Sequence, residues 1–517
     1  MSEETATPAE VRAPAWVAAL AGVLAGVAGL AVAELVAAVL APGASTVFAG
    51  GATVIDAAPP WLKDFAVESF GTADKAVLLG TMGVVLALGA AAAGMLELRR
   101  PPWGAVLFGI VGIVGAITAL LRPDATATWA VPSLVGIAAA LLVLWQAIRR
   151  LRPDAEAPGG SAAIDRRGFL LVAGAATGTT LLALAGARLL SAGAVAVKAA
   201  QETLRLPLPK TPAAAVPSGA DLGIDRLTPY ITPTADFYRI DTALRVPQLD
   251  PAAWSLQVHG MVDAPFTLTW DELLALPLEE HHATLACVSN EVGGDLIGNA
   301  LWLGYPIRAL LERARPRAGA DMVLSRSSDG FTAGTPLEVL RDPARAALLA
   351  IGMNGEPLPV IHGFPARLVV PGLYGYVSAT KWVTSLKVTT FAADQGYWTP
   401  RGWSALGPVK VQSRIDVPRG SVAAGEVTVA GVAWAQHTGI ARVEVRADGG
   451  EWVPARLADT VGPDTWRQWS VPIPLERGEH TLEVRATDAA GKVQTDAQAP
   501  PAPDGATGWH RVVVTAR

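Results

Sequence analysis

Apolar residues gather in long stretches at the start of the chain. The stretches 15–41, 75–98, 103–121 and 129–148 each approach the roughly 20 residues that cross a bilayer as a helix. They predict four transmembrane helices within residues 1–152 and, as a partner, membrane lipid.

The charges between these stretches are unevenly distributed. Arginines follow the second and fourth stretches, whereas the loop after the first is acidic, with Asp56, Asp64 and Glu68. Because basic residues stay mostly on the cytoplasmic side, this asymmetry places the N-terminus in the cytoplasm of a multi-pass protein of the cell membrane.

A fifth apolar stretch lies within residues 153–200, after a Pro- and Gly-rich loop at 153–161. It begins Asp165-Arg166-Arg167-Gly168-Phe169-Leu170. One interpretation is a twin-arginine export signal inside the chain, which suits a downstream domain that crosses the membrane folded. The other is an ordinary fifth span preceded by positive charge. The first places residues 201–517 on the extracytoplasmic side.

The rest of the chain, residues 201–517, is more polar, and its sequence pattern changes near residue 225 and again near residue 396. Residues 201–224 are rich in Pro and Ala, which indicates a semi-extended tether. Residues 225–395 alternate short strands (254–259, 322–325, 367–370, 382–388) with short helices (270–276, 306–313, 336–340), an α+β pattern.

Residues 396–517 contain alternating strands with turn signals and no helical period. The strands fall at 426–433, 440–447, 451–457, 465–471, 480–487 and 509–515. This spacing predicts an immunoglobulin-like β-sandwich. With no cysteine pair to join its sheets, we expect Trp434, Trp452, Trp466 and Trp469 in its core. The fold class is therefore multi-domain, with about five transmembrane helices, an α+β domain and a β-sandwich.

Composition and charge exclude several kinds of partner and cofactor. A net charge of -5 and scattered basic residues give no footprint for nucleic acid. The single cysteine excludes an internal disulfide and an Fe–S cluster of this chain's own. All seven histidines lie beyond residue 200, so the membrane part has no bis-histidine haem, and electrons that cross the membrane need an external electron-transfer protein.

Cys287 follows a short apolar run and precedes a Gly-rich turn. A lone cysteine is more often a small buried hydrophobe. Around it, however, stand several motifs in order: Asp236-Phe237-Tyr238-Arg239-Ile240-Asp241, Thr284-Leu285-Ala286-Cys287, Gly298-Asn299-Ala300-Leu301-Trp302-Leu303-Gly304, the run 352–359, the run 362–372 and Thr380-Lys381-Trp382.

This set resembles the sulfite oxidase family of molybdenum enzymes over residues 225–517. The resemblance implies a molybdenum–molybdopterin cofactor, with Cys287 as the soft thiolate ligand to the metal. It implies Arg239 as a second catalytic residue. It also implies a homodimer formed through the C-terminal β-sandwich, which ends in a matching Trp509-His510-Arg511-Val512.

The cofactor's phosphate and polar rings need fixed donors and acceptors. The positions that match the family's cofactor-binding residues are Tyr238, Arg239, Asp241, Cys287, Ser289, Asn290, Asp329, His362, Arg367, Ser378, Thr380 and Lys381.

The substrate pocket departs from the family pattern. Phe331 stands for a tyrosine, Glu291-Val292 for a basic pair and Ala502 for a late arginine. We therefore expect weak attraction for a dianion such as sulfite.

Three functions remain open. The first is oxygen-atom transfer at a small sulfur compound, with sulfite oxidation as the family default. The second is an extracytoplasmic sulfoxide reductase. The third is a cofactor-free, membrane-anchored binding module, which metal analysis separates from the other two.

Overall fold

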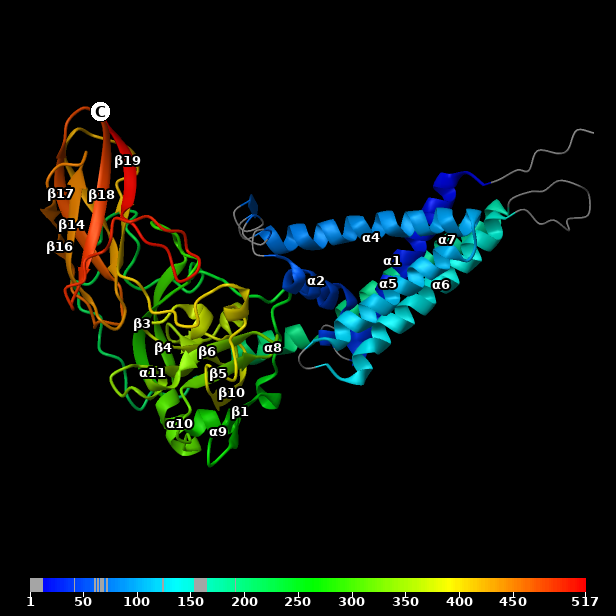
Figure 1. Cartoon of the computed structure of the whole chain (residues 1–517), viewed down its shortest axis with the longest axis horizontal. Coiled ribbons are helices and arrows are strands. Elements are labelled where there is room, and N and C mark those ends of the chain that lie inside the picture. The colour runs from blue at the N-terminus through cyan, green and yellow to red at the C-terminus, as the bar shows by residue number, and fades with distance from the viewer. Residues whose placement is uncertain are drawn as a thin grey trace, which may run out of the picture. The chain divides into compact units, whose positions relative to one another are not determined.

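The computed structural model describes residues 13–40, 42–59, 62, 65, 69–70, 73–122, 125–152, 165–190 and 192–517. The chain divides into two compact units, Met1–Val195 and Ala196–Arg517 (Figure 1). The expected loop at 153–161 lies outside the described residues, as do Asp64 and Glu68.

The described part of the first unit is helical. Its helices are α1 (Ala15–Leu40), α2 (Thr46–Ala57), α4 (Asp74–Arg99), α5 (Trp103–Leu120), α6 (Val131–Leu151) and α7 (Arg166–Leu190). Five helical stretches are long and apolar enough to cross a membrane, and they coincide with the four predicted spans and the stretch that begins at Arg166. They are compatible with membrane anchoring.

Glycines bring α1 close to two other helices. A Cβ on Gly22 would lie 2.0 Å from the carbonyl oxygen of Ala90 in α4, and one on Gly29 would lie 2.6 Å from that of Gly136 in α6. Such contacts let backbones approach and gain van der Waals packing. The backbone of α1 therefore lies close to α4 at Gly22 and to α6 at Gly29. Glu34 in α1 accepts hydrogen bonds from the Ser45 hydroxyl at 2.8 and 2.9 Å.

The second unit begins with two mixed layers of strands and short helices. One sheet has the order β2-β1-β10-β5-β6; the other has the order β3-β4-β7-β8, with β9 paired to β7. The strands are β1 (Ser255–Gly260), β2 (Phe266–Thr269), β3 (Glu279–Ala286), β4 (Ile297–Pro306), β5 (Met322–Ser327), β6 (Thr332–Pro336), β7 (Leu348–Met353), β8 (Glu356–Pro357), β9 (Arg367–Val369) and β10 (Val383–Thr389). The helices are α8 (Ala192–Thr203), α9 (Trp270–Ala275), α10 (Ile307–Ala314) and α11 (Leu337–Arg341).

Local sequence explains several of these boundaries. The Thr269 side chain accepts from the Glu272 N–H, and the Glu272 side chain accepts in return from the Thr269 N–H, a reciprocal cap that starts α9. β4 is buried along almost its whole length. It therefore lacks the polar alternation by which half-buried strands are recognised, and it was not predicted.

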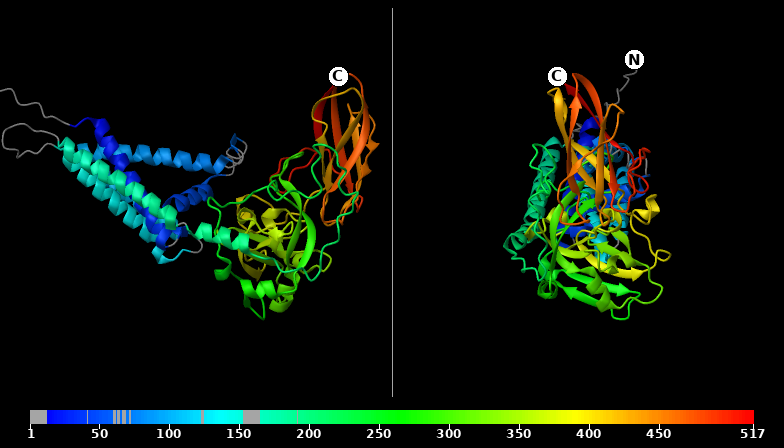
Figure 2. Two further views of the ribbon diagram at one scale, coloured as in Figure 1. Left: turned by 180° about the vertical axis from the view of Figure 1, so that it is seen from behind. Right: turned by 90° about the vertical axis from the view of Figure 1, so that its left-hand side faces the viewer.

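Two further sheets follow in the C-terminal region (Figure 2). Their orders are β11-β13-β17-β16 and β12-β19-β18-β14-β15. The strands are β11 (Gln412–Val417), β12 (Gly420–Val422), β13 (Gly425–Trp434), β14 (Ile440–Ala447), β15 (Val453–Pro454), β16 (Arg456–Leu457), β17 (Arg467–Leu475), β18 (Gly478–Asp488) and β19 (His510–Ala516). One hydrophobic cluster draws residues from both sheets, including Val429, Trp469 and Val484. The immunoglobulin-like topology itself stays a prediction.

The expectation of four core tryptophans needs one correction. Trp434, Trp466 and Trp469 are almost completely buried. Trp452 instead is partly exposed and packs edge-on against Trp509, with ring centroids 4.9 Å apart.

The stretch 201–224, predicted to be a semi-extended tether, forms hydrogen bonds with the residues that follow it. The Lys210 N–H donates to the Leu278 carbonyl at 2.8 Å, and the Glu280 N–H donates to the Thr211 carbonyl at 2.9 Å. Farther along, the Leu222 N–H donates to the Gln468 side chain at 2.7 Å. This part of the chain is laid along the edge strand β3 and onto the C-terminal region because its backbone finds partners there.

Candidate active site

Cys287 lies directly after β3, at the start of the loop that leads to β4. It is 8% exposed, and its N–H donates to the Leu296 carbonyl at the far end of the loop at 2.9 Å. Burial raises the pKa of the Cys287 thiol, while hydrogen bonds from Ser289 and the charge of Lys381 act in the opposite direction. The sulfur thus has donors in place for its anionic form.

Cys287 opens into a cavity of about 150 Å³. Seven of the predicted site residues line it: Tyr238, Asp241, Cys287, Ser289, Asp329, Arg367 and Lys381. They come from segments as far apart in sequence as the stretch before β1 and the stretch before β10. The structure therefore brings the larger part of the predicted set together.

Two buried cations stand in this group. The Arg367 side chain, 4% exposed, donates only to backbone carbonyls, those of His362, Leu368 and Ala379, at 3.2 to 3.5 Å. Burial lowers the pKa of Arg367 to about 10. Among the described residues no carboxylate forms an ion pair with it. A buried guanidinium without a counter-charge is costly, so the site is suited to an anionic ligand.

Lys381 is the second buried cation. Its ammonium donates to Asp241 and to the Ile361 carbonyl, both at 3.1 Å. Burial lowers the pKa of Lys381 to about 8, against the opposing effect of Asp241. Asp241 also pairs with Arg239 at 3.0 Å. Lys381 and Arg239 therefore share one carboxylate, that of Asp241.

His362 is buried beside this group at 1% exposure. In the described part of the chain neither ring nitrogen makes a hydrogen bond of ordinary geometry. Burial and the charges of Arg367 and Lys381 lower its pKa to about 3, so the ring is neutral near pH 7. A contact with the Thr234 backbone acts in the opposite direction on this pKa, and the buried ring can accept or donate a further hydrogen bond.

These features test whether the expected molybdenum cofactor fits. The Cys287 thiol suits a soft metal, the Arg367 guanidinium without a carboxylate suits a phosphate, and the buried His362 imidazole suits a polar ring. The donor set therefore fits the group.

The other predicted residues lie outside the cavity lining. Asn290 accepts from the Leu296 N–H at 2.8 Å and closes the loop. The Ser378 hydroxyl donates to the Tyr374 carbonyl at 2.9 Å, and the Thr380 hydroxyl bonds with Ser325 at 2.7 Å. Arg239 has a side chain 41% exposed. Their roles toward the cofactor stay predictions.

Aromatic residues that the motif comparison missed complete the cavity. Among them are Tyr376, Trp398 and Trp403, with the Trp403 ring centroid 5.9 Å from that of Tyr376 and 6.1 Å from that of Trp398. One signal was available, namely Tyr397, Trp398 and Trp403 within seven residues of a chain that is only 6% aromatic.

The positions that depart from the family pattern fall in different places. Phe331 lines the cavity, but Glu291, Val292 and Ala502 are not part of the lining in the described structure. The expected weak attraction for a dianion therefore stays a prediction.

The sequence of this chain is similar to those of known oxidoreductases. Residues 243–398 match the family described as oxidoreductase molybdopterin binding domain. The chain is 31% identical over 323 residues to the mitochondrial sulfite oxidase of Homo sapiens, which covers 52% of this chain and 58% of that protein. It therefore spans little more than half the length of that relative.

Two other proteins are similar over part of the chain. The uncharacterized oxidoreductase YuiH of Bacillus subtilis is 34% identical over 158 residues, 31% of this chain and 76% of that protein. The sulfane dehydrogenase SoxCD of Paracoccus pantotrophus aligns with a TM-score of 0.48 and 24% identity, over 56% of this chain and 84% of that chain.

Proposed function

The chain belongs to the sulfite oxidase family of molybdopterin-dependent oxidoreductases, and from that premise we propose that it transfers an oxygen atom at the sulfur of a small compound. The observation that carries the proposal is one cavity lined by Cys287, Arg367 and Lys381. When bound, the molybdenum cofactor supplies the two-electron redox chemistry.

The surroundings of the residues that line the cavity support a particular role for each of them. Arg367 and Lys381 hold the anionic tail of the cofactor, and Asp241 orients the Lys381 ammonium. Burial raises the pKa of the Tyr238 hydroxyl, which therefore keeps its proton and donates a hydrogen bond. The Ser289 hydroxyl stabilises the Cys287 thiolate.

The substrate we favour is a neutral organic sulfur compound. Phe331, Tyr376, Trp398 and Trp403 offer apolar surface, and dispersion and burial favour an organic substituent there over a hydrated dianion. Oxidation of a thioether then consumes water and releases two protons and two electrons. The second candidate is sulfoxide reduction, in which the sulfoxide takes up two protons and two electrons and releases water. A neutral sulfoxide suits the same aromatic lining.

The placement of the protein is part of the proposal. The apolar helices anchor it in the cell membrane, and the arginine pair at Arg166 and Arg167 supports export of the catalytic unit to the extracytoplasmic side. An external protein exchanges the electrons, because one cysteine cannot hold an Fe–S cluster. A homodimer formed through the C-terminal sheets completes the proposal.

The test is turnover of the full-length enzyme with an artificial electron carrier. Methyl phenyl sulfide or its sulfoxide should give a kcat/KM at least about tenfold above that for sulfite, since one good apolar contact is worth about 1.4 kcal/mol. Trp403→Ala should raise KM for the aryl compound about tenfold and change kcat less than about twofold.

Trp452→Ala is the matched control, because Trp452 packs on Trp509 outside the cavity. It should leave both constants unchanged. A higher kcat/KM for sulfite, together with no effect of Trp403→Ala, would return the protein to sulfite oxidation.

A further inference from the structure

The loop from Cys287 to Leu296 is closed by its own hydrogen bonds. The Cys287 N–H reaches the Leu296 carbonyl, and the Leu296 N–H reaches the Asn290 side chain. A Cβ on Gly294 would lie 2.6 Å from the Asn290 Oδ1. The loop is therefore compact, but these bonds fix its shape and leave its orientation to other parts of the protein.

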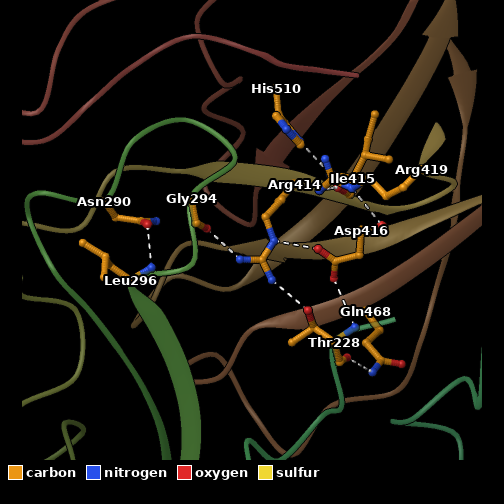
Figure 3. A network of polar contacts seen from close by, with 10 residues as sticks. All are labelled: Thr228, Asn290, Gly294, Leu296, Arg414, Ile415, Asp416, Arg419, Gln468 and His510. Atoms are coloured by element: carbon orange, nitrogen blue, oxygen red, sulfur yellow. Dashed lines mark hydrogen bonds and ion pairs between the residues drawn. The ribbon is translucent and has the colours of Figure 1, made fainter. Parts of the chain in front are cut away.

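Arg414 in β11 holds this loop from outside (Figure 3). Its Nη1 donates to the Gly294 carbonyl at 2.6 Å, its Nε to Asp416 at 2.6 Å and its Nη2 to the Thr228 hydroxyl at 2.8 Å. The side chains of Arg414 and Asp416 are 8% and 7% exposed. Three nitrogens with three partners in fixed directions make the guanidinium a rigid bracket.

His510 in β19 supports the same loop at the neighbouring residue. Gly293 has φ of +81°, and a Cβ there would lie 2.2 Å from the His510 ring. The Ile415 N–H donates to the His510 Nδ1 at 3.0 Å, and burial lowers the pKa of His510 to about 4. The ring is therefore neutral near pH 7 and fixed in direction.

The strand before Cys287 is tied to the same C-terminal region. The Trp466 N–H donates to the Thr284 hydroxyl at 2.8 Å, and the Thr284 N–H donates to the Asp464 carbonyl at 2.9 Å. The backbone on both sides of Cys287 is thus attached to the C-terminal region. Thr284 is bonded to the segment just before β17, and Gly294 is bonded to Arg414 in β11.

We propose that Arg414 is a positioning residue for the Cys287 thiolate, so that the C-terminal sheets form a working part of the active site. The proposal deepens the proposed function, which supplies the role of the thiolate. Catalytic geometry is sensitive to shifts of about 1 Å, which is the scale on which loss of one bracket acts.

Arg414→Lys tests this most directly. Lysine keeps the charge beside Asp416 but cannot serve all three partners at once. Arg446→Lys is the matched control, because Arg446 pairs with Glu483 at 2.6 Å in the same region and forms no hydrogen bond or ion pair with the described residues of the loop. Gly293→Ala disturbs the loop from its own side.

Cys287 is the only thiol in the chain, so alkylation by iodoacetamide reports on it alone. In the cofactor-free full-length protein, Arg414→Lys and Gly293→Ala should raise the alkylation rate at least about tenfold, with Arg446→Lys within about twofold. In the loaded enzyme, Arg414→Lys should lower kcat about tenfold or more with little change in KM.

Equal alkylation rates in Arg414→Lys, Gly293→Ala and wild type would overturn the proposal. If Arg414→Lys fails to fold, Gly293→Ala decides. The outcome is separable from the proposed function: a protein that binds no molybdenum yet shows the difference in alkylation refutes the function and keeps the positioning role.

Discussion

The Cys287 loop and the cluster of Arg367 and His362 border one site, yet their polar groups are satisfied in different ways. In the loop, Cys287, Asn290 and Gly294 find partners within the protein. In the cluster, the guanidinium has no carboxylate partner among the described residues, and neither ring nitrogen of His362 makes a hydrogen bond of ordinary geometry there. The polar groups of the loop are therefore satisfied without a ligand, whereas the charge of the cluster is balanced only when an anionic ligand binds.

The largest expected effect comes from removing the sulfur. Cys287→Ser should lower kcat by about a thousandfold or more, because a serine hydroxyl is a hard and normally protonated ligand. Cys287 closes the loop with its backbone N–H, which the substitution leaves in place, so the thermal midpoint should shift by only a few degrees. Steady-state kinetics, molybdenum content and a melting curve check this. Full activity in the variant would exclude Cys287 as the metal ligand.

Arg367→Met tests the difference between the Cys287 loop and the cluster of Arg367 and His362. It should reduce cofactor occupancy at least about tenfold while leaving the cofactor-free protein equally or more stable, since it removes a buried charge without a counter-charge. Thr335→Ala is the control: its buried hydroxyl donates to the Val377 carbonyl at 2.6 Å and lies outside the cavity lining, so the variant should lose about 1 kcal/mol of stability and keep its cofactor. Equal loss of cofactor in both variants would contradict the distinction.

The smallest effect is a pH dependence at His362. Its pKa is lowered from the ordinary value to about 3, so between these values the unfolded chain binds a proton that the folded chain does not. The unfolding free energy of the cofactor-free protein should therefore fall as pH falls through this range. His362→Gln should reduce that slope by up to about 1.4 kcal/mol per pH unit. Parallel curves from urea titrations of the two proteins would refute it.

The sequence predicted the long helices and most strands because each carries its own periodicity. The helical stretches at 15–41 and 103–121 differ from the observed α1 and α5 by one residue at the end. The strands that were missed are β2, β3, β4, β6, β7, β8, β11 and β12. Two of them show why: β3 begins with four polar residues, Glu279 to His282, and β4 is buried on both faces. Neither pattern has the period of a half-buried strand.

The site could be predicted where motif and geometry coincide, as at Cys287, Arg367 and Lys381. Thr380 does not line the cavity, because its hydroxyl is bonded to Ser325 in β5, a contact between distant segments that sequence spacing does not encode. Trp403 was missed for another reason. It follows residue 395, so the motif comparison placed it in the predicted C-terminal sandwich, although it lines the cavity.

The attachment of residues 210 and 211 to β3 affects how the catalytic unit can be produced without its anchor. β3 is an edge strand, and Thr211 pairs with its first residue, Glu279. Unpaired edges recruit strands from other molecules. A shortened protein that starts at residue 225, where the α+β pattern begins, would present that bare edge in every copy and be prone to aggregate. A start near residue 196 keeps the edge covered.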